Sequence, residues 1–356
     1  MTTETANRID NLIEDSGLFP SRQKVLKNVS SFDFSEDVIL ITGAAGSIGS
    51  GLTKQLMTCK FKKLILIDIA ESPLYDLIKS LEFIEHKNVE FKLLSITDAD
   101  SLKHLFETKK PSIVFHTAAY KHVPLMENNA NKAVETNILG TKLLADLSLK
   151  FKVIKFIFIS TDKAVNPINI MGITKKISED YLSYLNKKNE TKFITTRFGN
   201  IFGSNGSVVP LFKKQIEFEQ PLTITNNRIS RYFIGKSKAC QLILKLASLS
   251  NISNYAFTFD MGEPIKISDI IERLILYCNY ADQKPILKVV GLRSGEKLQE
   301  DIVSDHETLL KTDYKDILFI KQKKNSKLEP IDFSPLVNIS PSDSNSKIKT
   351  ILKTYI

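Results

Sequence analysis

Apolar runs and helix-like periodicity alternate along the first two hundred residues of the chain. Short runs rich in Ile, Leu, Val and Phe predict buried strands at Val38–Thr42, Leu64–Asp68, Val89–Leu94, Ile113–His116, Ile154–Ser160 and Phe193–Arg197. Between them, apolar residues recur at helical spacing over Ser47–Cys59, Ser72–Glu85, Ala99–Thr108, Ala133–Phe151 and Met171–Lys188. This alternation predicts right-handed βαβ units, and therefore an α/β fold with a doubly wound parallel sheet.

The pattern changes after residue 198. Glycines alternate with Asn and Ser from Gly199 to Ser207, and shorter elements follow to about residue 320. We expect this half to form a smaller, loop-rich C-terminal lobe that binds a substrate. In the tail, the Ser-, Pro- and Asn-rich residues 325–345 are expected to lie extended on the surface, and residues 347–356 to form a short amphipathic helix. The predicted organisation is a polar N-terminal extension (1–36), a nucleotide-binding domain (37–198, with segments returning from the C-terminal half), a substrate-binding lobe (199–320) and a C-terminal tail (321–356).

Composition and charge narrow the class of protein. The chain has 356 residues, 42% hydrophobic and 25% charged, as in ordinary globular proteins. Lys and Arg exceed Asp and Glu by 49 − 40 = 9, which suits an anionic partner such as a nucleotide diphosphate, or a Lys-rich solvated surface. Three widely spaced cysteines indicate neither a disulfide framework nor a metal site, and the apolar runs fall short of the roughly 18 residues that span a bilayer. We expect a cytoplasmic protein with no metal, no integral membrane segment and no nucleic-acid partner.

A glycine-rich turn follows the first predicted strand directly. Gly43, Gly46 and Gly49 stand in the spacing GxxGxxG and open a predicted helix. In such a loop the first glycine permits the tight turn, the second lets the backbone approach a pyrophosphate, and the third allows the helix to pack on the strand. The helix N-terminus then offers free N–H groups to phosphate oxygens. Because the turn lies between a strand and a helix, it predicts a Rossmann-type nucleotide site rather than a plain turn.

Asp68 ends the second predicted strand, 68 − 49 = 19 positions beyond the last glycine of this turn. A carboxylate at this place can accept hydrogen bonds from an adenosine ribose 2′-hydroxyl and repels a 2′-phosphate. No arginine stands beside it in the sequence. We therefore expect NAD rather than NADP as the cofactor.

Three consecutive polar residues directly follow the predicted strand at 154–160. Thr161, Asp162 and Lys163 follow Ser160, and they would lie at the carboxyl edge of the sheet, where ligands bind in open α/β folds. A hydroxyl, a carboxylate and an amine in one place can donate and accept protons. From the spacing alone, a capped strand end explains the same pattern.

Five motifs make the chain resemble the bacterial UDP-N-acetylglucosamine 4,6-dehydratases of polysaccharide biosynthesis, which are extended short-chain dehydrogenases/reductases. The resemblance covers roughly residues 36–305, with the motifs in order. In the motif GLRSGEKLQE (291–300), Ser294 stands where the family's GxRPGEKxxE has proline. The motifs are HTAAYKHVPLME (116–127), NILGT (137–141), STDKAVNPINIMGITKK (160–176), RFGNIFGSNGSVVPLF (197–212) and GLRSGEKLQE (291–300).

This resemblance implies a reaction and roles for several residues. Hydride passes from sugar C4 to NAD, the resulting 4-keto group acidifies C5, water is lost across C5 and C6, and the hydride returns to C6. The product is a UDP-2-acetamido-2,6-dideoxy-4-keto-hexose for surface polysaccharide or glycan biosynthesis. The resemblance implies that Lys163 is the C5 base, that Asp162 is the acid for the leaving hydroxyl, and that Thr161 bonds to O4.

One position departs from the common pattern of the superfamily. Most short-chain dehydrogenases carry Tyr-x-x-x-Lys, and the matching residues here are Met171 and Lys175, with the spacing 175 − 171 = 4 preserved. A thioether has no proton to transfer. The surrounding motif resembles a branch of the family that carries methionine, so we expect an active enzyme. In it, Asp162 or a water bound to Thr161 removes the O4 proton, and Lys175 holds the nicotinamide ribose.

The remaining site residues are also implied by the resemblance. We expect Asn137 to hold a bend or a water near the site, and the protein to form a homo-oligomer, as extended short-chain dehydrogenases commonly do. The candidate cofactor residues are Gly43, Gly46, Ser47, Ile48, Gly49, Asp68, Ala118, Ala119 and Lys175. The candidate UDP-sugar residues are Lys121, His122, Asn200, Ser207, Val208, Arg231, Arg293 and Glu296.

Two alternatives stay open. A UDP-sugar 4-epimerase shares the oxidation at C4 but does not require the acid and base of Asp162 and Lys163. A non-catalytic nucleotide-binding protein is supported only by Met171.

Overall fold

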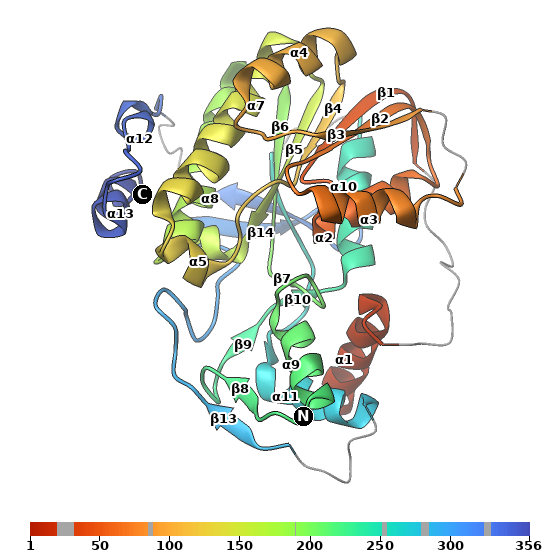
Figure 1. Cartoon of the computed structure of the whole chain (residues 1–356), viewed down its shortest axis with the longest axis vertical. Coiled ribbons are helices and arrows are strands. Elements are labelled where there is room, and N and C mark those ends of the chain that lie inside the picture. The colour runs from red at the N-terminus through yellow and green to blue at the C-terminus, as the bar shows by residue number, and fades with distance from the viewer. Residues whose placement is uncertain (20–31, 85–87, 189, 251–254, 279–284, 324–328) are drawn as a thin grey trace.

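The computed structural model describes residues 1–19, 32–84, 88–188, 190–250, 255–278, 285–323 and 329–356, which form a large α/β lobe and a smaller lobe (Figure 1). The main sheet has nine strands in the order β14-β15-β11-β6-β5-β4-β1-β2-β3. From β3 to β11 neighbouring strands are parallel, whereas β15 and β14 are antiparallel. The Rossmann-type doubly wound sheet is therefore confirmed. Its strands are β1 (Asp33–Thr42), β2 (Lys60–Asp68), β3 (Val89–Leu93), β4 (Ile113–His116), β5 (Lys155–Thr161), β6 (Lys192–Phe198), β11 (Ala256–Phe259), β14 (Glu307–Lys311) and β15 (Ile317–Gln322).

Both faces of this sheet are covered by helices. In β1, Ile39 and Ile41 belong to one hydrophobic core and Leu40 to the other, and all three are fully buried. Successive side chains of a strand point to opposite faces, so a strand buried on both sides is apolar at every position. One core contains α2 (Ser47–Leu56), α3 (Glu71–Ser80) and α10 (Lys236–Ser248), and the other contains α4 (Ala99–Lys109), α7 (Thr141–Lys150) and α8 (Ile170–Leu185).

The helix expected over residues 133–151 changes type along its length. Its parts are α6 (Ala130–Ala133), the π-helix η1 (Val134–Gly140) and α7. Asn137 lies in the π-helical part, and its carbonyl oxygen accepts hydrogen bonds from Thr141 Oγ1 at 2.7 Å and Ser178 Oγ at 2.8 Å. Its side chain pairs with the backbone of Tyr120, accepting from N at 2.9 Å and donating to O at 3.0 Å. Asn137 thus anchors the loop after β4, and π-helical segments of this kind are frequent at functional sites.

The smaller lobe includes the N-terminus of the chain. Residues 3–16 form a helix, α1 (Thr3–Ser16), whose Ile9, Leu12 and Ile13 are buried in a core shared with Phe212 and Ile270. The spacing i, i+3, i+4 of these three residues is that of an amphipathic helix, although the segment as a whole is polar. The other elements of this lobe are α9 (Val208–Glu217), α11 (Ile267–Tyr277), β7 (Asn200–Ile201), β8 (Leu222–Ile224), β9 (Ser230–Arg231), β10 (Phe233–Ile234), β12 (Ile265–Lys266) and β13 (Leu287–Val289).

The C-terminal tail packs on the large lobe instead of lying extended on the surface. It forms α12 (Ser334–Val337) and α13 (Asn345–Lys353), and residues 324–328 lie outside the described residues. Phe333 packs edge-on against Tyr181 of α8 with ring centroids 4.9 Å apart. Ile348 and Leu352 of α13 are fully buried in the same core as α8. The helical turn α12 and the buried Phe333 and Leu336 differ from the extended chain expected over residues 325–345, of which 325–328 lie outside the described residues. The short C-terminal helix expected over 347–356 is confirmed by α13.

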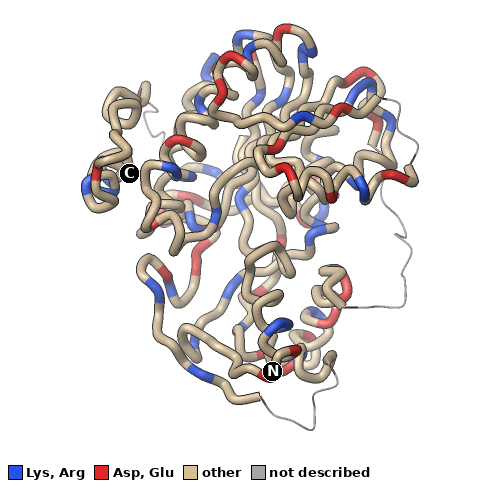
Figure 2. Tube along the Cα trace, viewed as in Figure 1, with Lys and Arg blue, Asp and Glu red and all other residues tan. Residues whose placement is uncertain are grey.

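Charged residues and cysteines are spread over both lobes. Lys and Arg are interleaved with Asp and Glu along both lobes (Figure 2). Cys59, Cys240 and Cys278 are free thiols. Within the described ranges, no group of three or more His, Cys, Asp or Glu is placed to hold a metal ion. No helix in that part of the chain is long and apolar enough to cross a membrane.

Candidate active site

The glycine-rich loop between β1 and α2 requires glycine for close backbone approach. Gly43 has φ +66°, and a Cβ there would lie 2.7 Å from the Cα and N of Ala118. A Cβ on Gly49 would lie 2.2 Å from the Gly43 carbonyl oxygen. Gly46 precedes α2 and no side chain caps that helix, so its first N–H groups are available to an anion.

Asp68 stands beside this loop at the end of β2. Its Oδ2 accepts a hydrogen bond from Ala45 N and its Oδ1 one from Ala70 N, each at 2.9 Å. Each carboxylate oxygen retains acceptor capacity, since an ionised carboxylate offers about four lone-pair sites. An uncapped helix N-terminus next to a half-buried carboxylate fits the pyrophosphate and ribose of a dinucleotide.

The other cofactor candidates lie around the same loop. Ala118 and Ala119 are half-buried in the segment after β4. Ile48 lies in the first turn of α2 and packs against the core formed by that helix. Ser47 Oγ accepts a hydrogen bond from the backbone N of Asn205 at 3.1 Å. This bond connects the glycine-rich loop between β1 and α2 to the loop at 203–207 in the smaller lobe.

Lys175 and Met171 occupy successive turns of α8, which lies against β5. Lys175 Nζ donates to the carbonyl of Ile159 at 2.8 Å and lies 4.3 Å from the ring centroid of Phe158. Burial lowers the pKa of Lys175 to about 7, and the nearby Glu179 only partly opposes this effect. Met171 is 2% exposed and belongs to the hydrophobic core. Its thioether has no proton to donate to the site.

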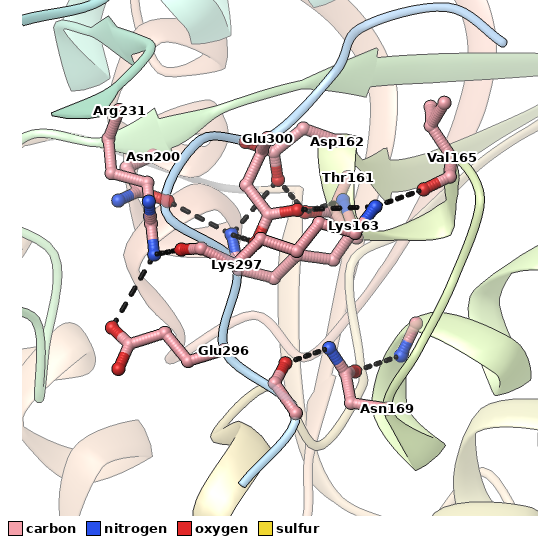
Figure 3. Close-up of polar contacts among 12 residues, drawn as sticks. Thr161, Asp162, Lys163, Val165, Asn169, Asn200, Arg231, Glu296, Lys297 and Glu300 are labelled. Atoms are coloured by element: carbon pink, nitrogen blue, oxygen red, sulfur yellow. Dashed lines mark hydrogen bonds and ion pairs between the residues drawn. The ribbon is translucent and has the colours of Figure 1, made fainter. Parts of the chain in front are cut away.

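The chemical cluster lies where β5 ends in the 3₁₀ turn η2 (Asp162–Ala164) (Figure 3). Asp162 is fully buried, and its Oδ1 accepts from Thr161 Oγ1 at 2.8 Å and from Lys163 Nζ at 3.0 Å. Lys163 Nζ also donates to Asn200 Oδ1 at 3.3 Å. The second oxygen of Asp162, Oδ2, is buried with no hydrogen-bond partner among the described residues. Leaving a buried polar atom without a hydrogen bond costs free energy, so Asp162 Oδ2 marks a place where a ligand hydroxyl or a water molecule would donate a hydrogen bond.

Gly172 allows α8 to approach this cluster. A Cβ on Gly172 would lie 2.2 Å from the carbonyl oxygen of Lys163. Asn169 caps the helix by accepting from the N–H of Gly172 at 2.7 Å, and its Nδ2 donates to the carbonyl of Gly295 at 2.9 Å. The turn η2, the start of α8 and the segment 293–300 are therefore held together (Figure 3).

Glu300 is a member of the cluster to which the sequence analysis gave no role. Its side chain is 2% exposed, with Oε1 3.9 Å from Lys163 Nζ and Oε2 3.9 Å from Lys297 Nζ. Burial raises the pKa of Glu300, and the Lys163 cation opposes that rise. The signal available in the sequence was the second carboxylate of the GLRSGEKLQE motif, of which only Arg293 and Glu296 received roles.

Arg231 and Glu296 hold the segment 293–298 in this structure. The Arg231 guanidinium donates to the carbonyls of Ser230, Lys297 and Leu298 at 2.8–2.9 Å and lies 3.4 Å from Glu296 Oε1. Glu296 Oε2 accepts from the backbone N of Arg293, whose side chain is exposed. The substrate contacts expected of these three residues stay predictions.

The remaining substrate candidates lie in two segments that contact each other, 121–122 and 200–208. Lys121 Nζ donates to Ser204 Oγ at 3.3 Å, and burial lowers the pKa of Lys121. His122 lies against Gly206, where a Cβ would come within 2.5 Å of its ring, and burial followed by the charge of Lys121 lowers the pKa of His122. Ser207 precedes α9, which begins at Val208, and in the described structure the Ser207 hydroxyl is buried without a partner. Of the substrate candidates, all within the described residues, Asn200 is the one that bonds directly to Lys163.

Comparison with known proteins identifies the family of this chain. The family model described as polysaccharide biosynthesis protein matches residues 39–322. The chain is 39% identical over 271 residues to the probable polysaccharide biosynthesis protein EpsC of Bacillus subtilis, covering 76% of this chain and 45% of EpsC. It spans about half the length of the first curated relatives it matches, at 45% and 47%.

Two further relatives are covered over most of their length. The chain is 32% identical over 283 residues to a UDP-N-acetylglucosamine 4,6-dehydratase (inverting) of Campylobacter jejuni, covering 78% of this chain and 80% of the relative. It is 31% identical over 290 residues to a UDP-glucose 4-epimerase of Rickettsia rickettsii, covering 80% and 82%. Among solved structures, that of Pen from Bacillus thuringiensis superposes with a TM-score of 0.71 and 28% identity over 83% of this chain and 89% of Pen. These matches confirm the family expected from the five motifs. The chain belongs to the polysaccharide biosynthesis protein family, within the short-chain dehydrogenase/reductase fold.

Proposed function

We propose that this protein catalyses the NAD-dependent 4,6-dehydration of UDP-N-acetylglucosamine, to supply a 4-keto-6-deoxy sugar for surface polysaccharide or glycan biosynthesis. The observation that carries the proposal is the ion pair between the fully buried Asp162 and the partly buried Lys163, with one oxygen of Asp162 left without a partner among the described residues. Elimination across C5 and C6 needs an acid and a base side by side. The similarity to the dehydratase of Campylobacter jejuni supports the same reaction.

The proposed cofactor site is the loop around Gly43 and Gly46, with Asp68 on the adenosine ribose and Lys175 on the nicotinamide ribose. NAD bound there would supply the hydride acceptor at C4 and the hydride donor at C6. Asp68 favours NAD, since its carboxylate repels a 2′-phosphate. Ala118 and Ala119 have no long side chains, and this leaves room beside the loop after β4.

Lys163 acts as the base that removes the C5 proton. Its Nζ is held between Asp162 Oδ1 and Asn200 Oδ1, so two hydrogen bonds direct the amine. A positioned base of this kind contributes about 10²–10⁴-fold to the rate. Burial of the surrounding carboxylates excludes water that would compete for the proton.

Asp162 accepts, through Thr161, the proton that leaves the sugar O4 and donates a proton to the hydroxyl that leaves C6. Its Oδ1 is bonded to Thr161, whose hydroxyl connects it to the sugar O4. As O4 is oxidised, its proton passes to the Thr161 oxygen while the Thr161 proton passes to Asp162 Oδ1, so Asp162 becomes the protonated acid. Asp162 then gives this proton to the hydroxyl that leaves C6, and water is formed. This route needs no tyrosine, and so it accounts for methionine at position 171.

The direct test is to incubate the protein with UDP-N-acetylglucosamine in deuterated water and record proton NMR spectra. A new C6 methyl signal with deuterium at C5 is the expected result. The variant Lys163→Met should lose product formation by at least about 10²-fold, whereas Lys176→Met, which removes a half-exposed lysine of α8, should not. Persistence of the starting sugar, with NAD bound, would support the non-catalytic alternative.

A UDP-sugar 4-epimerase is the second candidate, and the similarity to the Rickettsia rickettsii enzyme favours it. It would oxidise C4 in the same site but would not use Lys163 on C5. The same spectra distinguish the two, since an epimerase produces the galacto isomer without a C6 methyl group and without deuterium at C5.

A further inference from the structure

Glu300 is held in a fixed place beside the catalytic lysine by contacts from both lobes. It ends the segment 293–300, which is bonded to Asn169 through the Gly295 carbonyl at 2.9 Å. Lys297 of the same segment donates to the carbonyls of Val165 and Asn166 at 3.1 and 2.9 Å. Figure 3 shows the side chains of Asp162, Lys163, Lys297 and Glu300 directed toward one another. A carboxylate anchored in this way has little freedom to turn elsewhere.

Two buried carboxylates thus share the amine of Lys163. Asp162 Oδ1 lies 3.0 Å from Lys163 Nζ and Glu300 Oε1 lies 3.9 Å from it. Asp162 is fully buried and Glu300 is 2% exposed. The like charge of Asp162 acts to raise the pKa of Glu300. A proton in this cluster therefore has three nearby places to reside: the Lys163 amine and the two carboxylates.

The charged groups around Glu300 come from three parts of the fold. Asp162 and Lys163 belong to η2, Arg231 to β9, and Lys297 to the segment of Glu300 itself. Burial is the largest influence on the pKa of Glu300 and raises it, as does Asp162, while Lys163, Arg231 and Lys297 act in the opposite direction. The balance leaves the pKa of Glu300 raised, so this carboxyl group holds a proton more readily than an exposed glutamate does.

We propose that Glu300 is the proton-exchange partner of Lys163. This inference rests on the proposed dehydration, because only that reaction requires Lys163 as a neutral base. The Lys163 ammonium gives one proton to the Glu300 carboxylate through one water that bridges the 3.9 Å between them: an N–H bond breaks, the water passes on one of its own protons, an O–H bond forms on Glu300, and the nitrogen keeps the electron pair. Net charge in the cluster is unchanged by this transfer. The neutral amine is then ready to take the proton from C5, and Glu300 is a positioning residue that acts through Lys163.

Three roles of Glu300 predict three different pH profiles for the variant Glu300→Gln. If Glu300 exchanges the proton, the neutral amine of the parent protein forms internally, so its rate is flat across the neutral range. The variant amine must then lose its proton to water, so its rate rises about tenfold per pH unit until the lysine titrates. If Glu300 only stabilises the ammonium by its charge, its loss makes the amine easier to deprotonate and raises the neutral rate. If Glu300 is only structural, the rate falls equally at every pH.

The experiment measures deuterium incorporation at C5 of UDP-N-acetylglucosamine as a function of pH, for the parent, Glu300→Gln and Asp301→Asn. Asp301 is the adjacent exposed carboxylate, so its variant removes the same charge outside the cluster. We expect Glu300→Gln to lose on the order of 10²-fold at neutral pH and to recover at alkaline pH. Asp301→Asn should follow the parent, and Glu300→Asp should restore part of the flat region.

A second measurement separates this inference from the proposed function. The absorbance of the reduced cofactor after rapid mixing reports oxidation at C4, which does not use Lys163. Glu300→Gln should keep this signal at neutral pH while losing exchange at C5. A parallel fall of both signals at all pH values would overturn the proton-exchange role. A parent protein that oxidises C4 but never forms the methyl product would instead overturn the dehydratase, and the inference with it.

Discussion

Lys349 Nζ lies 2.7 Å from Glu127 Oε2, an ion pair that ties the C-terminal helix α13 to α5 (Val123–Glu127). The other oxygen of Glu127, Oε1, accepts a hydrogen bond from the backbone N of Ile170 at 2.7 Å. Ile170 begins α8, the helix that carries Met171 and Lys175. One carboxylate therefore connects the end of the chain to the start of the active-site helix.

The first prediction concerns this connection. Lys349→Met should lower the free energy of unfolding by about 1 kcal/mol, because the ion pair is only partly exposed. Glu127→Ala should cost about 1–2 kcal/mol, since it also leaves the Ile170 N–H without its acceptor, as loss of an N-cap does. In the Glu127→Ala background, Lys349→Met should have almost no effect. Urea unfolding of the two single variants and the double variant measures this coupling, with Lys353→Met of the same helix as the exposed control. Equal losses for Lys349→Met and Lys353→Met would contradict it.

The second prediction concerns the close approach of α8 to the catalytic turn. Gly172→Ala places a Cβ 2.2 Å from the Lys163 carbonyl, a backbone atom that has little room to move. We expect a loss of about 1–3 kcal/mol in stability and, since a shift of about 1 Å in a reacting group can cost 10²-fold, a large fall in activity. Gly140→Ala is the matched control, because its Cβ would meet the Ile96 side chain at 2.8 and 3.0 Å, with the Ile96 carbonyl oxygen no closer than 3.5 Å. Thermal unfolding and product formation of both variants, compared with the parent, check this, and similar behaviour of the two would refute it.

The third prediction concerns the buried lysine of α8. The pKa of Lys175 is lowered from 10.5 to about 7 by burial, so between these pH values the unfolded chain binds the proton and the folded protein does not. Stability of the parent should therefore rise with pH from about 7 to about 10.5, by up to about 1.4 kcal/mol per pH unit. Below pH 7 the folded protein carries the full cost of the buried charge. Lys175→Met removes this cost, so its stability relative to the parent should be highest at pH 6 and decline toward pH 10.

Urea unfolding at several pH values tests this third prediction. Lys175→Met also leaves the Ile159 carbonyl without its donor, but that loss is the same at every pH and cancels in the comparison. Lys176→Met, with its side chain 32% exposed, is the control and should show no such slope. A pH-independent difference between Lys175→Met and the parent would show that the lysine is not neutralised by folding.

The fourth prediction concerns a buried ion cluster behind the site. Arg197 of β6 bonds to Glu179 Oε2 at 2.6 Å and to Glu307 Oε2 at 2.9 Å, and all three side chains are buried. Arg197→Met should cost about 3–5 kcal/mol because it leaves two buried carboxylates uncompensated. Arg228→Met, at an exposed arginine, should be close to neutral in the same unfolding experiment.

The same cluster predicts an acid sensitivity. Burial acts to raise the pKa of Glu307, but its bonds to Arg197 prevail and lower it below 4.5. The stability that this carboxylate contributes is therefore present above pH 4.5 and is lost as pH falls through its lower folded value. Glu307→Gln should reduce the dependence of stability on pH in this acidic range. An unchanged pH dependence would contradict the assignment.

Local pattern was sufficient for six of the nine strands of the central sheet and for the glycine-rich turn. Every strand predicted between residues 38 and 197 is present, since a strand buried on both faces must be apolar at successive positions. The turn of Gly43, Gly46 and Gly49 was recognisable because backbone approach of this kind admits only glycine. The family followed from long motifs, and its confirmation came from residues 39–322 as a whole.

Other features depended on segments that are far apart in the chain. The amino acids near α1 and in the tail are mostly polar, and only packing showed that Ile9 and Ile348 are core residues. Glu300 is 300 − 163 = 137 residues from Lys163, and no periodicity or spacing links them. An arginine can bind phosphate, but the Arg231 guanidinium donates instead to the carbonyls of residues 297 and 298.

The sequence by itself thus determined the strands and helices between residues 38 and 197, their order and the consecutive Thr161, Asp162 and Lys163, because these depend on residues that are neighbours along the chain. Only the tertiary structure decided which charges surround the catalytic lysine and which helices close the site. The physical reason is that burial and electrostatic influence act through space over a few ångströms, and two positions far apart in sequence acquire such a distance only when the chain has folded.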